Sequence, residues 1–246
     1  MRLIPVIDVL HGVVVRGIAG RRSEYRPIVS KLTSSTNPVE VARALIDAVQ
    51  PRELYLADLD AIQGSSLAND VYRQIYALGV DVWVDAGTAD RAGALQIADS
   101  GCHVVAGLET VPGQEVLREI IDAIGSSRVV FSLDLRDGKP LRDWHLSPQP
   151  PHLGAKGEAE RITARAVECG ITRMIVLDLA RVGIGEGTGT DELCRWIAST
   201  YPHVEVIAGG GISTPTDVAR LESFGVRGVL VASALHSGSL LVRGSQ

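Results

Sequence analysis

The feature that most limits how this chain can fold is a regular alternation of short apolar stretches with segments of helical periodicity. Eight apolar stretches are typical of buried strands: residues 2–12, 54–58, 80–85, 102–107, 129–134, 173–178, 204–208 and 228–232. Helices are expected from residue 38 onwards and over 67–77, 90–100, 113–124, 157–169, 191–199 and 215–224. This order predicts an α/β protein whose parallel strands close into a (β/α)8 TIM barrel. An open, doubly wound sheet is the alternative.

The end of the first apolar stretch is repeated in similar form about half a chain later. Residues 7–12 read Ile-Asp-Val-Leu-His-Gly and residues 133–138 read Leu-Asp-Leu-Arg-Asp-Gly, so Asp8 corresponds to Asp134. Three further strand pairs match at a similar offset, which predicts one domain over 1–246 made of half-barrels at about 1–125 and 126–246. Because little follows Ser237, we expect a short or absent eighth helix. That end of the barrel is then available to a second subunit in a homo-oligomer.

Composition narrows the class of protein. The net charge is -5 and no basic stripe is present, which argues against nucleic acid as a partner. No apolar run reaches the ~18 residues of a membrane span, and the N-terminus lacks the apolar core of a signal peptide. We therefore expect a cytoplasmic protein without a membrane partner. The three cysteines are far apart and indicate neither a zinc site nor a disulfide framework.

A long polar connection, residues 12–35, separates the first strand from the first helix. It contains several arginines, among them Arg16, and the glycines Gly17 and Gly20. A loop of this length in a compact domain is usually either disordered or functional. We expect residues 12–35 to form a lid over the active site.

Carboxylates stand where the strands are expected to end, which is the active-site end of a TIM barrel. Asp8 and Asp134 occupy equivalent positions, and we expect them to face one another as a catalytic acid and base. Crowded carboxylates would raise the pKa of one of them so that it holds a proton at working pH. The alternative is that both merely cap neighbouring loops.

Other polar residues near the strand ends are expected to bind substrate. These are Asp58, Asp85, Asp178, Arg16 and His145. The same group of acids could instead hold a divalent cation through oxygen ligands. We expect no metal ion and no other cofactor.

A glycine run after the seventh strand predicts a phosphate site. Gly209, Gly210 and Gly211 are followed by a helix start, and Ala232 and Ser233 end the neighbouring eighth strand. Backbone N–H groups in such turns can approach an anion, and phosphate sites in TIM barrels commonly lie after strands seven and eight. A purely structural tight turn is the alternative. The glycine-rich residues 183–189 are expected to form a flexible loop over the mouth.

Four segments resemble the histidine-biosynthesis barrel family, which includes ProFAR isomerase and the cyclase subunit of imidazole glycerol phosphate synthase. They are residues 4–8, 58–60, 132–138 and 207–212. The resemblance covers nearly the whole chain. It implies a duplicated half-barrel, Asp8 and Asp134 as acid and base, and two phosphate sites related by an internal twofold.

The chain departs from the family pattern at one of those phosphate sites. After the third strand, the glycine-rich turn of the family is replaced by Asp85-Ala86-Gly87-Thr88, and the fourth strand ends at Gly107-Leu108-Glu109. Two carboxylates there would repel a dianion. The family's hydroxyl residue before Asp178 is also replaced, by Leu177. We expect the phosphate site at the seventh and eighth strands to work and the other to be lost.

These observations predict an enzyme similar to ProFAR isomerase that acts by aspartate acid/base catalysis. Its substrate is expected to be a small, sugar-like or carbonyl metabolite with one phosphate, and the reaction an aldose–ketose isomerisation or a lyase step. One-carbon cofactor biosynthesis is one setting that the resemblance suggests. The alternatives are an authentic ProFAR isomerase and a catalytically inactive barrel that serves as a binding or assembly subunit.

Overall fold

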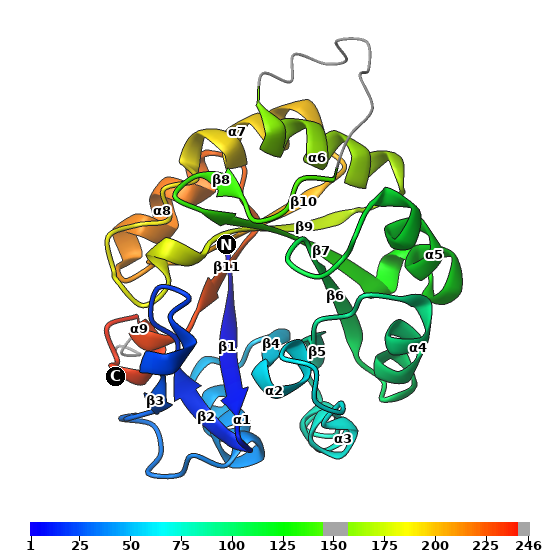
Figure 1. Cartoon of the computed structure of the whole chain (residues 1–246). Coiled ribbons are helices and arrows are strands. Elements are labelled where there is room, and N and C mark those ends of the chain that lie inside the picture. The colour runs from blue at the N-terminus through cyan, green and yellow to red at the C-terminus, as the bar shows by residue number, and fades with distance from the viewer. Residues whose placement is uncertain (145–156, 241–246) are drawn as a thin grey trace.

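A computed structural model describes residues 1–144 and 157–240. Its centre is a closed ring of eight parallel strands: β1 (Arg2–Leu10), β4 (Glu53–Asp58), β5 (Asp81–Asp85), β6 (His103–Gly107), β7 (Val129–Arg136), β9 (Arg173–Asp178), β10 (Glu205–Gly209) and β11 (Gly228–Val231). The last strand pairs with the first, with Arg2 opposite Gly228 and Pro5 opposite Val231. This closure confirms the predicted TIM barrel and excludes the open sheet (Figure 1).

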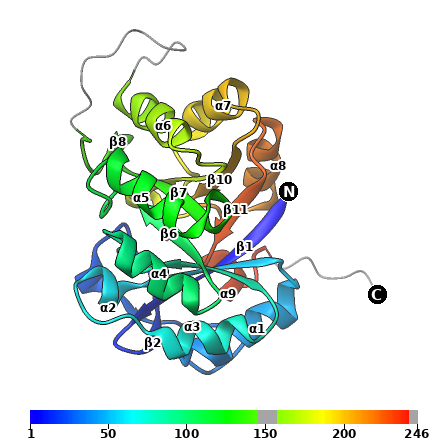
Figure 2. The same cartoon turned by 90° about the vertical axis from the view of Figure 1, so that its right-hand side faces the viewer.

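Helices cover the outside of the ring (Figures 1 and 2). They are α1 (Pro38–Val49), α3 (Asn69–Tyr76), α4 (Arg91–Asp99), α5 (Gln114–Ile124), α6 (Glu158–Glu168), α7 (Asp191–Thr200) and α8 (Pro215–Ser223). The short helices α2 (Leu59–Ile62) and α9 (Ser233–His236) and the 3₁₀ turns η1 (Arg22–Glu24) and η3 (Leu179–Arg181) lie instead at the end of the barrel where the strands end. A further 3₁₀ turn, η2 (Ser126–Arg128), precedes β7. The four-residue α9 after β11 confirms the expected short eighth helix. The short α2 was not predicted. None of the helices in the described ranges is long and apolar enough to cross a membrane.

Local sequence signals explain where the helices begin. The side chain of Asn37 accepts hydrogen bonds from Val39 N and Glu40 N at 3.0 and 3.2 Å, and Pro38 occupies the first turn of α1. These contacts satisfy backbone donors that a helix start leaves unpaired. At α8, Thr214 and Asp217 form a reciprocal capping box.

Two apolar layers hold the barrel together. The larger packs the helices against the outer face of the strands, and the smaller fills the inside of the ring with side chains such as Ile4, Trp83, Val130 and Ile207. Alternate residues of a strand point to opposite faces, so each strand contributes to both layers. Because the interior is packed, the open space for a ligand lies at the mouth.

Residues 12–35 are more ordered than the predicted loop. They include β2 (Val13–Arg16), antiparallel to β1, η1, and β3 (Arg26–Pro27), antiparallel to β2. Strand β7 likewise pairs antiparallel with the short β8 (Lys139–Pro140). A hairpin thus follows Asp8 and Asp134 alike, in keeping with the internal repeat, while the half-barrel boundaries stay a prediction.

Candidate active site

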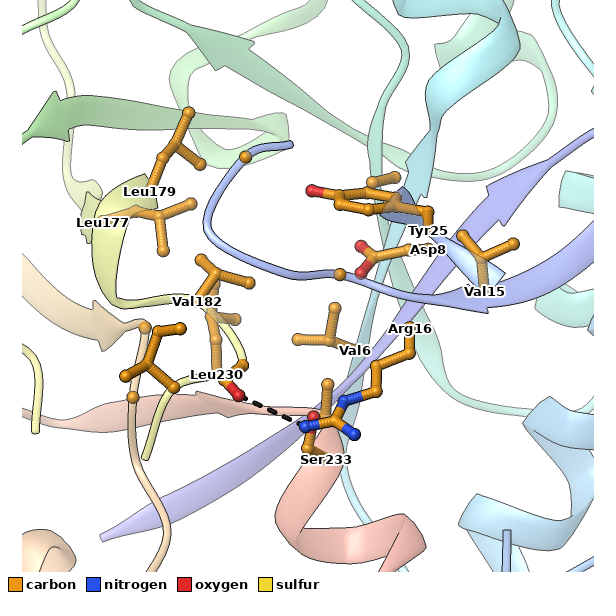
Figure 3. A pocket seen from close by; sticks show the side chains of 18 of the residues that line it. Val6, Asp8, Val15, Arg16, Tyr25, Leu177, Leu179, Val182, Leu230 and Ser233 are labelled. Carbon is orange, nitrogen blue, oxygen red and sulfur yellow. Dashed lines mark hydrogen bonds between the residues drawn. The ribbon is translucent and has the colours of Figure 1, made fainter. Parts of the chain in front are cut away.

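A cavity of about 520 Å³ opens where the strands end, and both Asp8 and Asp134 line it together with Asp85. Figure 3 shows Asp8, Val15 and Tyr25 across the cavity from Leu177 and Leu179. The two aspartates come from β1 and β7. The structure therefore brings the predicted acid/base pair to one opening.

The carboxyl group of Asp8 lies under the lid, residues 12–35. A Cβ added at Gly17 would stand 2.8 Å from Oδ2 of Asp8, so the lid backbone closely approaches this carboxylate. Burial, and then the negative charge of Asp85, raises the pKa of Asp8 to about 7. No donor within residues 1–144 and 157–240 makes a hydrogen bond to this carboxyl group. It is thus available to exchange a proton with a ligand.

Asp134 is more firmly held than Asp8. Ser132 Oγ donates to its Oδ1 at 2.6 Å, and the backbone N–H of Glu109 donates to its Oδ2 at 3.3 Å. Burial and the charge of Asp85 raise its pKa to about 7, and the Ser132 hydrogen bond opposes that rise. Both members of the pair can therefore gain or lose a proton near neutral pH.

Asp85 is the charge that the two catalytic candidates share. Tyr55 Oη donates to its Oδ2 at 2.8 Å and Gly87 N to its Oδ1 at 3.3 Å. Burial raises the pKa of Asp85, while these two hydrogen bonds favour its charged form. Three carboxyl groups that interact at one mouth cannot all ionise readily, which favours a proton shared among them.

Arg16 also lies where the sequence placed it. It lines the cavity, and its Nη2 reaches the carbonyl oxygen of Gly183 at 3.4 Å (Figure 3). A second contact joins the same loops, because Ala19 N donates to Val182 O at 2.8 Å. The lid is therefore tied to residues 182–183, which follow η3.

Two residues that were expected to bind substrate, Asp58 and Asp178, do not line the cavity. Each is 2% exposed. Asp58 accepts from Ala61 N and Ala68 N and from the hydroxyl of Tyr72, while Asp178 accepts from the backbone N–H groups of residues 137, 138 and 180. These carboxylates organise the turns after β4, β7 and β9. His145 lies outside the described residues.

Part of the predicted phosphate site forms a wall of the cavity, while phosphate binding itself stays a prediction. Gly210, Gly211, Ala232 and Ser233 line the cavity, and their turns follow the paired strands β10 and β11. Gly209 does not, because it packs under Leu177 and Leu230, where a Cβ would stand 2.9 and 3.2 Å from their methyl carbons. Gly209 therefore contributes to barrel packing, and its phosphate role stays a prediction.

The donors that remain for an anion are backbone N–H groups. In the described part of the chain, those of Gly210 and Gly211 have no hydrogen-bond acceptor. The N–H groups of Ser213 and Thr214 are already bound to Oδ2 of Asp217, at 3.2 and 3.0 Å. An anion would therefore meet the turn at residues 210–211 rather than the start of α8.

The expected absence of a metal ion at the acidic mouth stays a prediction. No group of three or more His, Cys, Asp or Glu side chains within the two described ranges is placed to hold an ion. Asp85 and Asp134 accept hydrogen bonds from Tyr55, Ser132 and backbone N–H groups, whereas Asp8 accepts none from the described residues.

Sequence reasoning missed several residues that shape the site. Ser132 could have been found, since it stands two residues before Asp134 on one strand and so faces the same side. Tyr55 lies on β4, whose neighbour β5 carries Asp85. Tyr25 and Arg22 line the cavity from the lid, and no local pattern indicated how that loop would fold.

Comparisons with known proteins agree with this geometry. The sequence model of the family described as histidine biosynthesis protein matches residues 2–241. An isomerase of Cenarchaeum symbiosum that is named for a phosphoribosyl-imidazole-carboxamide substrate (ProFAR isomerase) is 32% identical over 100% of this chain and 99% of its own. A protein of the same name from Crocosphaera subtropica is 31% identical over 98% and 90%. An uncharacterised protein of Methanocaldococcus jannaschii is 29% identical over 98% and 95%.

A match of this extent, on a closed barrel with paired aspartates at its mouth, determines the family. The chain belongs to the histidine biosynthesis protein family.

Proposed function

We propose that the protein is an isomerase that interconverts the aldose and ketose forms of a phosphorylated, sugar-like substrate. One of the pair Asp8 and Asp134 donates a proton to the ring oxygen as the ring opens. The other removes a proton from the carbon next to the resulting carbonyl or imine, and a return transfer completes the shift, so no atoms are gained or lost. The observation that carries this proposal is two carboxyl groups with pKa values of about 7 on one cavity.

The phosphate end of the substrate is proposed to lie at the turns after β10 and β11. Support comes from the N–H groups of Gly210 and Gly211, which are free of acceptors in the described chain and line the cavity. Backbone donors fixed in a turn bind an anion without reorganisation. Arg16 lines the same cavity and adds a positive charge.

The opposite wall supports a substrate with one phosphate. Asp85 and Glu109 line the cavity at the ends of β5 and β6. Two like unit charges about 4 Å apart near a protein surface repel each other with an energy of roughly 4 kcal/mol. A phosphate dianion is repelled more strongly. A hydroxyl, amide or amine end is the better partner for this wall.

A second candidate is ProFAR isomerase activity itself. It is supported by relatives of that name that align with nearly the whole chain at 31–32% identity. The comparisons favour this substrate over any other that can be named, while the carboxylates at β5 and β6 favour a substrate with a single phosphate. A lyase step at a carbonyl would use the same two aspartates, but no observation favours it over isomerisation. An inactive assembly subunit would have no need for two aspartates with pKa values near neutrality.

Growth of a histidine auxotroph that lacks ProFAR isomerase distinguishes the two substrates. Expression of this protein at a normal level would restore growth if it is a ProFAR isomerase, and Asp8→Asn or Asp134→Asn would abolish the rescue. The matched control is Asp81→Asn, because Asp81 is an exposed aspartate at the start of β5, away from the mouth.

Failure of the rescue by a folded protein would favour the substrate with one phosphate. In that case a panel of phosphorylated sugars is tested by thermal shift. Compounds that raise the melting temperature are then assayed for isomerisation. A panel in which no phosphorylated compound binds would contradict both candidates.

A further inference from the structure

An ion pair joins the lid to the end of β6 across the mouth of the barrel. Nη2 of Arg22, in η1, lies 3.2 and 3.1 Å from the two carboxylate oxygens of Glu109. Both side chains line the cavity and keep partial access to solvent, at 32% and 41%. The lid is thus held on this side by Glu109 and on the other by Val182 and Gly183.

Glu109 contacts the catalytic candidate Asp134 as well as the lid. Its backbone N–H donates to Oδ2 of Asp134 at 3.3 Å. The charges of Glu109 and Arg22 act on Asp85 in opposite directions, the first raising and the second lowering the pKa of that carboxyl group. One residue therefore connects the position of the lid with the electrostatics of the proton-transfer groups.

The chemistry of Arg22 suggests what Glu109 replaces. A guanidinium group at the mouth of a cavity is a good partner for a carboxylate or phosphate, because its N–H groups match two oxygens at once. In this protein the two oxygens that Arg22 contacts are those of the Glu109 carboxylate. An anionic group of a ligand would have to displace Glu109 before it could bind Arg22.

We propose that Glu109 is a specificity-determining and positioning residue that takes the place of a second anionic group of the substrate. Because Glu109 pairs with Arg22, the lid stays over Asp8 without a contribution from the ligand. The same pair favours substrates whose far end is uncharged or cationic. This inference rests on the proposed function in one respect, namely that the first phosphate binds at residues 210–211.

Inorganic phosphate is a suitable probe, because it reports both anion sites without a known substrate. The experiment compares the wild-type protein with Glu109→Ala, Glu109→Gln and the double variant Glu109→Ala/Arg22→Ala by calorimetric titration. The matched control is Asp70→Ala, which removes a carboxylate paired with Arg73 at 3.4 Å on α3, away from the cavity. Circular dichroism confirms that each variant is folded, and the near-isosteric Gln variant keeps the test valid if the Ala variant is not.

The wild type and Asp70→Ala are expected to bind one phosphate, and both single Glu109 variants two. The second phosphate disappears in the double variant. Limited trypsin digestion gives an independent readout, since loss of a partly exposed ion pair shifts an opening equilibrium by up to about fivefold. Cleavage after Arg21, within the lid, should accelerate by up to that factor in both Glu109 variants and not in Asp70→Ala.

The outcomes separate this inference from the proposed function. A wild-type protein that binds no phosphate would contradict the proposed phosphate site. One phosphate in both the wild type and the Glu109 variants, with unchanged cleavage of the lid, would overturn the role of Glu109. A second phosphate that persists in the double variant would show that Arg22 is not its ligand.

Discussion

The hydroxyl group of Ser132 donates a hydrogen bond of 2.6 Å to Oδ1 of Asp134. The two residues are adjacent on one face of β7, because side chains two positions apart on a strand point the same way. This bond stabilises the charged carboxylate and opposes the effect of burial on its pKa. Ser132 therefore lowers the pH range over which Asp134 can transfer protons, against the larger effects of burial and of the charge of Asp85.

Replacement of Ser132 by alanine should raise the pKa of Asp134 from its value of about 7. Loss of one hydrogen bond to a charged group is worth roughly 1.5–3 kcal/mol at most, so we expect a shift of about one pKa unit. The limb of the pH–rate profile that Asp134 controls should move to higher pH. Ser100→Ala is the control, because Ser100 is a buried serine far from the cavity. A profile that matches the wild type would show that Asp134 does not limit the rate.

Asp8→Asn should change the pH dependence of folding stability in a defined direction. The pKa of Asp8 in the folded protein is about 7, above the ordinary aspartate value of 3.8, so the folded state keeps a proton that the unfolded state has released. The wild-type protein must then lose stability as pH rises from about 4 to 7. The Asn variant escapes this loss, and its free energy of unfolding should exceed that of the wild type by on the order of 2–4 kcal/mol at pH 8.

Urea unfolding at pH 5 and pH 8 measures this difference, which should be much smaller at pH 5. Asp81→Asn, at the exposed start of β5, is the control and should show no such dependence. Equal effects of Asp8→Asn at both pH values would argue against a raised pKa.

The repeat in the sequence predicted that Asp8 and Asp134 form the catalytic pair. It could not predict which of two directions the side chain of a strand-end carboxylate takes. One points into the mouth and the other caps the next turn. Asp58 and Asp178 take the second, and Asp58 does so as the N-cap of the four-residue α2, which sequence periodicity could not reveal. Periodicity identifies buried strands and helices well, whereas the direction of one terminal side chain depends on the turn that follows.

The lid is a second example of structure that could not be predicted from the sequence. Its length indicated a function, yet β2 and β3 are too short for a pattern, and the contact between Arg22 and Glu109 joins residues 87 positions apart. Such a pair depends on how the loop folds back over the barrel. The sequence identifies Glu109 as a strand-end carboxylate that departs from the family pattern, but it does not identify Arg22 as its partner.

Gly17→Ala should impair activity with little change in stability. A methyl group there would stand 2.8 Å from Oδ2 of Asp8 and 3.3 Å from Cγ1 of Val182, so the lid or the carboxylate must shift. Displacement of a catalytic group by about 1 Å can cost on the order of 10²-fold in rate. The comparison is Gly113→Ala, where no atom lies within 4 Å of the added Cβ. Equal kcat/KM values for the two variants would show that the lid does not position Asp8.

Gly211→Ala should weaken phosphate binding. Gly211 has φ +70°, and an added Cβ would collide with the carbonyl oxygen of Gly187, so the turn must open. Gly225→Ala is the matched control, because Gly225 has φ +88° but lies outside the cavity. Left-handed backbone costs a residue with a Cβ about 1–2 kcal/mol, so both variants should be less stable. Only Gly211→Ala should lose the rise in melting temperature that inorganic phosphate gives the wild type, and an undiminished rise would place the anion elsewhere.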